Sequence, residues 1–214
     1  MSDIFEEVEE DVKRDRAIAL WKKYGPYAIA AGVGVVLIAA AITWYMEYRR
    51  TQAEKAAMQF VAAADLAAGT DKARAVTAFA AIARDAPAGY GLLSRFYDAA
   101  LKGQMADHAA SVSQYRALAA DSSALPELRS AATLLAAMHV AITASVAEVE
   151  REVAPLTAGD GPWRHVALEL VAVAAIKAGD VAKARQVYSQ IADDGAAPQA
   201  LRGRAAEMLA ALGT

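Results

Sequence analysis

The feature that most constrains this chain is a long apolar run near its amino end. No charged residue lies between Lys23 and Glu47, where the sequence reads YGPYAIAAGVGVVLIAAAITWYM. As an α-helix, the run from 25 to 46 extends about 33 Å, which is enough to cross the hydrocarbon core of a bilayer. The sequence therefore predicts a membrane-spanning signal-anchor helix over residues 24–46.

Aromatic and basic residues border this run on both sides. Lys22 and Lys23 precede it, and Arg49 and Arg50 follow it. Tryptophan and tyrosine rings prefer the headgroup region, and long basic side chains reach from there into water. Both features favour a membrane span. The residues predicted to lie at the two membrane interfaces are Trp21, Tyr24, Tyr27, Trp44, Tyr45 and Tyr48.

The sequence leaves two alternatives open for the same run. One is a helix buried in the core of a soluble protein. The other is a cleaved signal peptide, because Ala39, Ala40 and Ala41 resemble a small-residue cleavage site. The long acidic region before the run, and the continuation of the run to Met46, favour an anchor that is not cleaved.

The segment before the span, residues 1–23, is predicted to be a cytoplasmic acidic amphipathic helix. Asp3 and Glu6 have the spacing of a capping box, and Ile4, Val8 and Val12 recur at helical intervals. More basic residues precede the span than follow it closely, which favours an amino terminus in the cytoplasm. The segment either leads into the span only or docks a basic surface of a partner.

Residues 47–214 are predicted to form helices separated by short breaks. Apolar positions recur at intervals of three and four, without the alternation that is typical of strands. Alanine is the commonest residue, and it both favours helices and lets them pack closely. The chain has no cysteine and a net charge of −3, which excludes disulfides and gives no basic surface for nucleic acid. The predicted fold class is all-α.

Prolines divide this region at a nearly constant interval of about 36 to 39 residues, as in stacked helical repeats. Proline is favourable at the first position of a helix, so each is predicted to begin one. The prolines are Pro87, Pro126, Pro162 and Pro198. Glycines lie about four helical turns after three of them and are predicted to be helix C-caps. These glycines are Gly103, Gly179 and Gly213. Each interval is therefore predicted to hold a hairpin of two helices.

The predicted second helices carry a pattern that resembles tetratricopeptide repeats. Such repeats place a small residue, an aromatic residue, an apolar residue and a proline at offsets of four, three and five. The first copy, which matches these offsets, is Ala75, Phe79, Ile82 and Pro87. Looser copies are Ser111, Tyr115 and Leu118 before Pro126; Val149, Val153 and Leu156 before Pro162; and Ala184, Tyr188 and Ile191 before Pro198. The resemblance implies a tetratricopeptide-like hairpin solenoid over 47–214, and a generic array of helical hairpins is the alternative.

The acidic lead-in, a span that begins Trp-Lys-Lys-Tyr-Gly-Pro-Tyr and a divergent repeat domain together resemble the YfgM-type family of ancillary SecYEG translocon subunits. The resemblance implies a single-pass protein of the bacterial inner membrane, with its amino terminus in the cytoplasm and its repeat domain in the periplasm. It also implies association with the SecYEG translocon and hand-over of secreted proteins to periplasmic chaperones. A scaffold of a cell-envelope or division complex is the alternative function.

The sequence shows no arrangement of residues that points to catalysis. The histidines at 108, 139 and 165 share no metal-ligand spacing, and no GxSxG or phosphate-loop motif is present. Glu148, Glu150 and Glu152 are interpreted as a solvated helix face. We therefore predict no enzyme activity, no cofactor or metal, no small-molecule substrate and no nucleic-acid partner.

A helical solenoid offers partners a concave surface that is lined by its first helices. One arginine lies in the predicted first helix after each proline, which suggests a basic stripe for acidic segments of a partner. The offsets of these arginines from the prolines differ, so scattered solvated side chains are the alternative. The four residues are Arg95, Arg129, Arg164 and Arg202.

Overall fold

The computed structural model describes the backbone of residues 3–213 and the side chains in this range except those of residues 3–13, 15–17, 19, 28 and 88. The apolar stripe predicted before the span, at Ile4, Val8 and Val12, therefore lies outside the described side chains. The described residues form nine α-helices and no strand, which confirms the all-α class. Contacts divide the chain into two units, Met1–Glu54 and Lys55–Thr214, each described below by itself.

The first unit is part of one long helix. α1 (Asp3–Ala68) includes the whole predicted span. Pro26 lies inside this helix, where it removes one backbone N–H from the hydrogen-bond ladder. The ring of Trp21 covers the neighbouring Gly25 so closely that a Cβ there would come within 3.3 Å of the indole. α1 therefore passes through the glycine-proline pair without ending.

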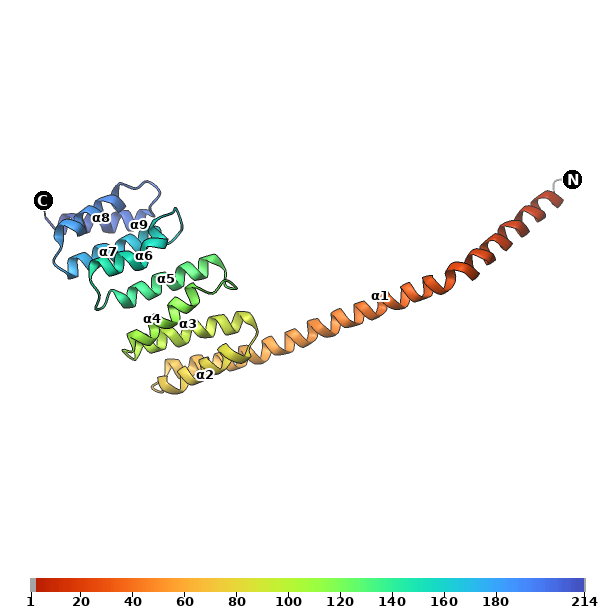
Figure 1. Ribbon diagram of the computed structural model, residues 1–214, viewed down its shortest axis with the longest axis horizontal. Coiled ribbons are helices and arrows are strands. Elements are labelled where there is room, and N and C mark those ends of the chain that lie inside the picture. Colours follow the sequence, from red (N-terminus) through yellow and green to blue (C-terminus); the bar gives the residue numbers. More distant parts are fainter. Residues whose placement is uncertain (1–2, 214) are drawn as a thin grey trace. The chain divides into compact units, whose positions relative to one another are not determined.

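The second unit is a row of short helices that pack in chain order (Figure 1). The helices after α1 are α2 (Lys72–Asp85), α3 (Ala88–Gln104), α4 (His108–Ala119), α5 (Pro126–Val140), α6 (Val146–Thr157), α7 (Arg164–Lys177), α8 (Val181–Asp193) and α9 (Gln199–Ala211). They form four pairs: the end of α1 with α2, α3 with α4, α5 with α6, and α7 with α8. α9 follows α8 as a final single helix. This arrangement confirms the predicted solenoid of helical hairpins.

Each second helix of a pair begins at a side-chain cap. The carboxylates of Asp71, Asp107 and Asp180 accept hydrogen bonds from the backbone N–H three residues later, in α2, α4 and α8. Ser145 does the same for α6 and forms a capping box with Glu148. These side chains satisfy N–H groups that have no partner inside the helix. The capping residues therefore fix where each second helix starts.

The prolines precede or begin the first helices, but only one has the predicted position. Pro126 is the first residue of α5. Pro87 and Pro198 are instead the N-cap residues of α3 and α9, and Pro162 lies two residues before α7. The prediction was wrong for these three prolines. The fixed φ of proline and its missing N–H suit the N-cap region as well as the first helical position.

Two of the three predicted glycine caps are present. Gly179 and Gly213 have φ angles of 79° and 73° just after α7 and α9. The prediction was wrong for Gly103, which lies inside α3, whereas Ala106 takes the left-handed conformation with φ at 63°. A Cβ at residue 103 would overlap the ring of His139. Gly103 therefore gives room to a neighbouring helix rather than ending its own.

The core is built largely from small side chains. Alanines at 75, 99, 132, 136, 137, 167, 172, 175 and 184 are completely buried. Larger side chains fill the space between the pairs; the ring of Phe79 lies 5.3 Å from that of Phe60 and 5.1 Å from that of Tyr97. These three rings join the end of α1, α2 and α3. Close helix packing thus follows from the alanine content, as expected for interdigitated small and large residues.

Candidate protein-interaction face

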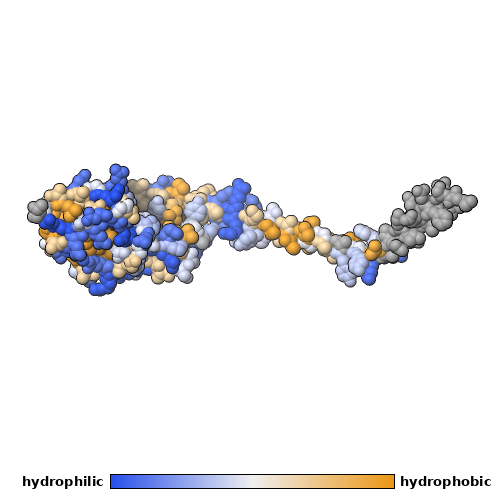
Figure 2. Space-filling view, turned by 90° about the horizontal axis from the view of Figure 1, so that it is seen from above, coloured by the Kyte–Doolittle hydropathy of each residue, from blue (hydrophilic) through white to orange (hydrophobic). Residues whose placement is uncertain are grey.

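The predicted membrane segment is apolar and exposed along α1 where the structure describes its side chains. One helix in the described residues, α1, is long and apolar enough to cross a membrane, and the side chains of its most apolar stretch are exposed. Figure 2 shows this stretch as a hydrophobic surface between hydrophilic residues. The six aromatic residues predicted at the interfaces are all more than half exposed. Trp44 stacks on Tyr48, and Arg49 lies over the ring of Tyr45.

The second-helix pattern lies in the core of the repeat domain. Ala75 and Phe79 of α2 are completely buried, and Ile82 is nearly so. Every corresponding residue of the other second helices is also buried. These are Ser111, Tyr115 and Leu118 in α4; Val149, Val153 and Leu156 in α6; and Ala184, Tyr188 and Ile191 in α8. Ala75, Ser111, Val149 and Ala184 thus hold equivalent positions and provide a common reference for the four repeats.

The first helices expose apolar side chains on one face. Six large apolar residues of the first helices are exposed at three recurring sequence positions. These positions lie 18, 14 and 11 residues before the reference residue of the same repeat. The six residues are Val61, Leu93, Tyr97, Met138, Val166 and Val173. Offsets that differ by four and three residues belong to one face of a helix. Leu128 is exposed three residues before Ala131 and extends this face of α5 by one turn, whereas Met58 is exposed at a different offset. The exposed apolar surface of the first helices is therefore concentrated on one side.

The remaining residues at these offsets extend the same surface. They are Ala57, Ala64, Ala100, Ala131, Leu135 and Leu170, all half-buried. None of the twelve residues carries a charge. Because successive pairs stack in the same way, equivalent faces lie on the same side of a solenoid. We call these twelve residues the first-helix face.

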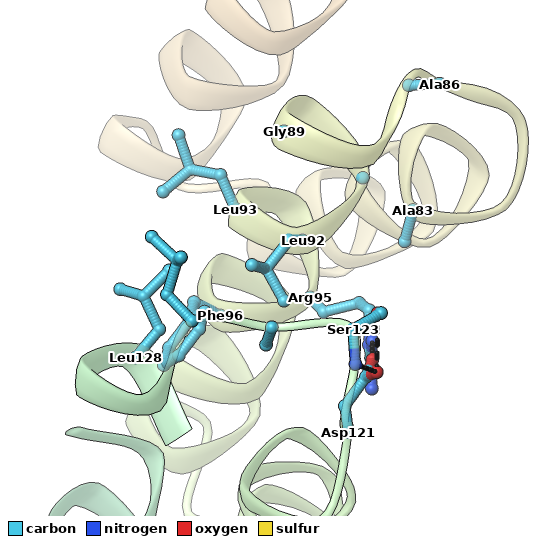
Figure 3. Close-up of a pocket in the computed structure, with 13 residues that line it drawn as sticks. Ala83, Ala86, Gly89, Leu92, Leu93, Arg95, Phe96, Asp121, Ser123 and Leu128 are labelled. Atoms are coloured by element: carbon cyan, nitrogen blue, oxygen red, sulfur yellow. Dashed lines mark hydrogen bonds and ion pairs between the residues drawn. The ribbon is translucent and has the colours of Figure 1, made fainter. Parts of the chain in front are cut away.

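A hollow adjoins this face beside α3. It has a volume of about 540 Å³ and is lined by the end of α2, the start of α3, the loop between α4 and α5, and the start of α5. In Figure 3 the side chains of Leu92, Leu93, Phe96 and Leu128 surround it. Leu93 belongs both to the hollow and to the first-helix face. The apolar surface thus includes a recess of a size that can receive large side chains.

The sequence pattern of the tetratricopeptide repeat-like domain family matches residues 19–199. The chain belongs to this family. No curated protein and no solved structure matches the chain significantly. Helical repeat domains of this kind are typically interaction modules without enzymatic activity, which agrees with an exposed apolar face on their first helices.

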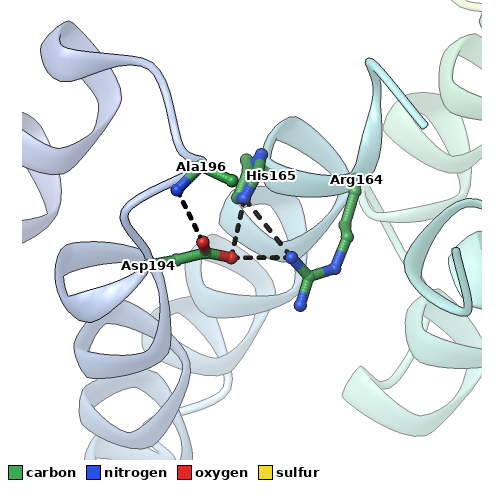
Figure 4. A network of polar contacts seen from close by, with 4 residues as sticks. All are labelled: Arg164, His165, Asp194 and Ala196. Carbon is green, nitrogen blue, oxygen red and sulfur yellow. Dashed lines mark hydrogen bonds and ion pairs between the residues drawn. The ribbon is translucent and has the colours of Figure 1, made fainter. Parts of the chain in front are cut away.

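Two of the four predicted arginines are engaged within this tetratricopeptide-like domain. Arg95 forms an ion pair with Asp121 in the loop after α4. Arg164 binds Asp194 at 2.6 Å, and Asp194 also lies 3.0 Å from Nε2 of His165. Figure 4 shows how these three side chains meet. Each aspartate in addition accepts a backbone N–H two residues later, from Ser123 and from Ala196.

The other two arginines differ in their surroundings. The Nε atom of Arg129 is buried without a hydrogen-bond partner, and Arg202 is half-buried. The contacts of Arg95 and Arg164 order the loops between repeats. A basic stripe formed by all four arginines stays a prediction.

Three ion pairs connect successive repeats and were not anticipated from the sequence. Arg116 of α4 binds Glu152 of α6 at 2.7 Å, and Lys183 of α8 binds Glu150 of α6 at 2.6 Å. Arg204 of α9 binds Glu169 of α7 at 2.8 Å. Glu150 and Glu152 are therefore not a purely solvated face, because they join neighbouring second helices. Their partners lie more than thirty residues away, beyond the reach of a local spacing argument.

Within the described residues, no group of three or more histidine, aspartate or glutamate side chains has the geometry of a metal site. The histidines lie in two separate places, His165 beside Asp194 and His108 beside His139.

The first-helix face was not predicted from the sequence. Aligning the first helices on their reference residues would have revealed it, because the same three offsets are apolar in every repeat.

Proposed function

We propose that the protein is a membrane-anchored interaction module that binds other proteins through its first-helix face. The observation that supports this function best is the absence of charge at all twelve exposed or half-buried positions of that face. An apolar surface that water contacts is stabilised when a partner covers it. The face and its adjoining hollow thus provide both area and a recess for apolar side chains of a partner.

The proposed arrangement has three parts. Residues 1–23 lie in the cytoplasm, residues 24–46 cross the bacterial inner membrane, and residues 47–214 lie in the periplasm. Support for the membrane part comes from the exposed apolar stretch of α1 and its aromatic borders. Anchoring keeps the domain near membrane complexes and raises its effective concentration there. Modest contacts of the solenoid then suffice for binding.

The specific role that we propose is that of an ancillary translocon subunit. In this role the domain meets secreted polypeptides as they leave the SecYEG channel and passes them to periplasmic chaperones. Support comes from the resemblance of the whole arrangement to the YfgM-type family, together with an uncharged face suited to unfolded apolar segments. A scaffold of an envelope or division complex would use the same domain without contacting such polypeptides.

Site-specific photo-crosslinking in native membranes tests this function. The full chain carries the crosslinker at Leu93, Tyr97 or Val173 of the first-helix face, and control chains carry it at the exposed Thr77 or Gln186 of second helices. We expect translocon components and secreted chains to be captured from the face and not from the controls. Capture of division or outer-membrane assembly proteins alone would support the scaffold instead. Equal capture from face and control positions would contradict the proposed binding face.

Orientation needs a separate measurement. A reporter that is active only in the periplasm is fused after Thr214, and a second fusion joins it before residue 2. The proposed orientation predicts activity for the first fusion only. Activity of the amino-terminal fusion alone, with both fusions expressed equally, would reverse the orientation.

A further inference from the structure

His108 and His139 form a direct contact between two repeats. His108 is the first residue of α4 in the second pair, and His139 lies in the last turn of α5 in the third pair. Their Nδ1 atoms are 3.2 Å apart, and their ring centroids are 5.4 Å apart. The two Nδ1 atoms are thus within hydrogen-bonding distance of each other. Such a contact requires one ring to donate its Nδ1–H and the other to accept with a bare Nδ1.

The ring of His139 is held firmly by its surroundings. It stacks on Tyr115 of α4 with a centroid distance of 5.9 Å and an interplanar angle of 16°. Its other neighbour is Gly103 of α3, where any side chain would overlap the imidazole. Three helices from two repeats therefore meet at one titratable ring. A change in the charge of this ring acts on the junction between the second and third pairs.

We propose that the His108–His139 pair is a proton-sensitive contact, which holds these two repeats together while at most one ring is protonated and loosens the junction when both are. The first proton added can bind a free Nε2, and the resulting imidazolium still donates Nδ1–H to its neutral partner. The second proton occupies the accepting Nδ1. Two N–H donors and two positive charges then face each other, so the hydrogen bond is lost and the rings repel.

Other charged groups near this junction already have partners. On α3, Lys102 binds Asp98. On α4, Asp107 caps the helix through the N–H of Ala110, and Arg116 binds Glu152 of α6. On α7, Lys177 donates to the carbonyl oxygens of Ala141 and Ile142, just after α5.

Neither ring of the pair hydrogen-bonds to a carboxylate among the described residues. No counter-ion of this kind therefore offsets a second positive charge. Burial and the neighbouring His108 both lower the pKa of His139, which agrees with a ring that resists protonation. This inference concerns the stability of the repeat junction and does not depend on the proposed partner.

The third histidine provides a matched control. Nε2 of His165 lies 3.0 Å from Oδ2 of Asp194, so its nearest titratable neighbour is a carboxylate instead of a second imidazole. Nε2 of His165 also lies 3.4 Å from Nη1 of Arg164, and no second imidazole lies against the ring that could repel it. His165→Gln therefore changes the number of titrating histidines without affecting the pair.

The test is an NMR titration of the imidazole groups in the full chain, held in detergent micelles, between pH 8 and 4.5. We expect the pair to titrate in two steps separated by more than about one pH unit, as coupled groups do. His108→Gln should leave a single step for His139, and His165→Gln should leave both steps of the pair unchanged. If His108 and His139 titrate independently and at the same pH in the wild-type chain, the proposal is wrong. This result needs only the wild-type chain, so it holds even if neither variant folds.

Hydrogen exchange tests the structural consequence in the same samples. After correction for intrinsic exchange, protection at the start of α4 and the end of α5 should fall about tenfold between pH 7 and pH 5, which corresponds to about one pKa unit of coupling. His108→Gln should abolish most of this fall, whereas His165→Gln should retain it. An equal fall in all three chains would contradict a role for the pair.

Discussion

Ala106 adopts a backbone conformation that residues other than glycine rarely take. Its φ angle is 63°, and it follows the C-cap residue of α3. Its N–H bonds to the carbonyl of Gly103, and the N–H of Asp107 bonds to the carbonyl of Lys102. The same pair of hydrogen bonds surrounds Gly179 after α7. The chain thus uses one helix-ending motif with a glycine in one repeat and an alanine in another.

Replacing Ala106 with glycine should therefore stabilise the protein. The left-handed conformation costs alanine more than glycine, and part of this gain is lost because glycine increases the entropy of the unfolded chain. We expect Ala106→Gly to raise the free energy of unfolding by about 0.5 kcal/mol, measured by urea denaturation. Ala178→Gly is the control, because Ala178 is right-handed with φ at −79°. That variant should be less stable than wild type; a stabilisation at both sites would disprove the conformational explanation.

Asp121 gives the repeat domain a defined sensitivity to acid. Hydrogen bonds from the Ser123 hydroxyl, from Arg95 and from the Ser123 backbone N–H lower the pKa of Asp121 to about 2. The folded state therefore binds fewer protons than the unfolded state between this value and the ordinary aspartate pKa near 4. The contribution of Asp121 to stability is complete above that range and is lost as the pH falls through it.

Denaturation midpoints measured from pH 5 to pH 2 test this expectation. The midpoint of the wild-type chain should fall over this range, and Asp121→Asn should reduce the steepness of the fall because the titrating group is absent. Asp160→Asn changes an exposed aspartate in the loop before α7 and should leave the steepness as it is. Identical curves for wild type and Asp121→Asn would refute the assignment.

At the scale of helices, Phe79 is the main link within the first repeat. Its ring is fully buried and contacts rings on the end of α1 and on α3. Truncation of a buried phenylalanine to alanine leaves a cavity and costs about 3–5 kcal/mol. Because repeats contact mainly their neighbours, the loss should remain local.

Phe79→Ala should thus abolish hydrogen-exchange protection in α2 while leaving α7, α8 and α9 protected. Phe79→Leu fills most of the same space and should have a smaller effect. Uniform loss of protection in all helices would show that the solenoid unfolds as one cooperative unit instead.

At the scale of the whole molecule, the exposed apolar stretch of α1 is expected to hold the protein in a membrane. Arginine at the centre of a membrane helix costs about 2.5–3.5 kcal/mol by insertion scales. Val35 and Val36 lie near the middle of the predicted span, and both are exposed. The double variant Val35→Arg and Val36→Arg should therefore shift the protein from the membrane pellet to the supernatant after alkaline extraction.

The matched control places the same two charges farther along α1. Met58 and Gln59 are exposed and follow the predicted span. Met58→Arg with Gln59→Arg should leave the protein in the pellet. Extraction of both variants to the same extent would argue against a membrane span at residues 24–46.

The fold could be predicted because its determinants are local. The uncharged run, the helical spacing of Ala75, Phe79 and Ile82, and the periodic prolines can each be read within a short window of sequence. The ends of helices were harder to predict. Gly103 lies inside α3 although glycine is typical of a helix end, and Ala106 takes the left-handed conformation after α3 that glycine usually adopts. The ring of His139 occupies the space that a side chain at residue 103 would need, and the two residues are far apart in the chain.

The sequence by itself determined the all-α class, the apolar run and the hairpin repeat, because hydrophobic periodicity and helix-breaking residues act over a few residues. Only the tertiary structure decided which charges bind each other and which apolar residues stay exposed. Arg116 with Glu152, His108 with His139, and the first-helix face all depend on how one repeat packs on the next. Packing between helices brings together side chains about thirty residues apart, and no local pattern encodes such a distance.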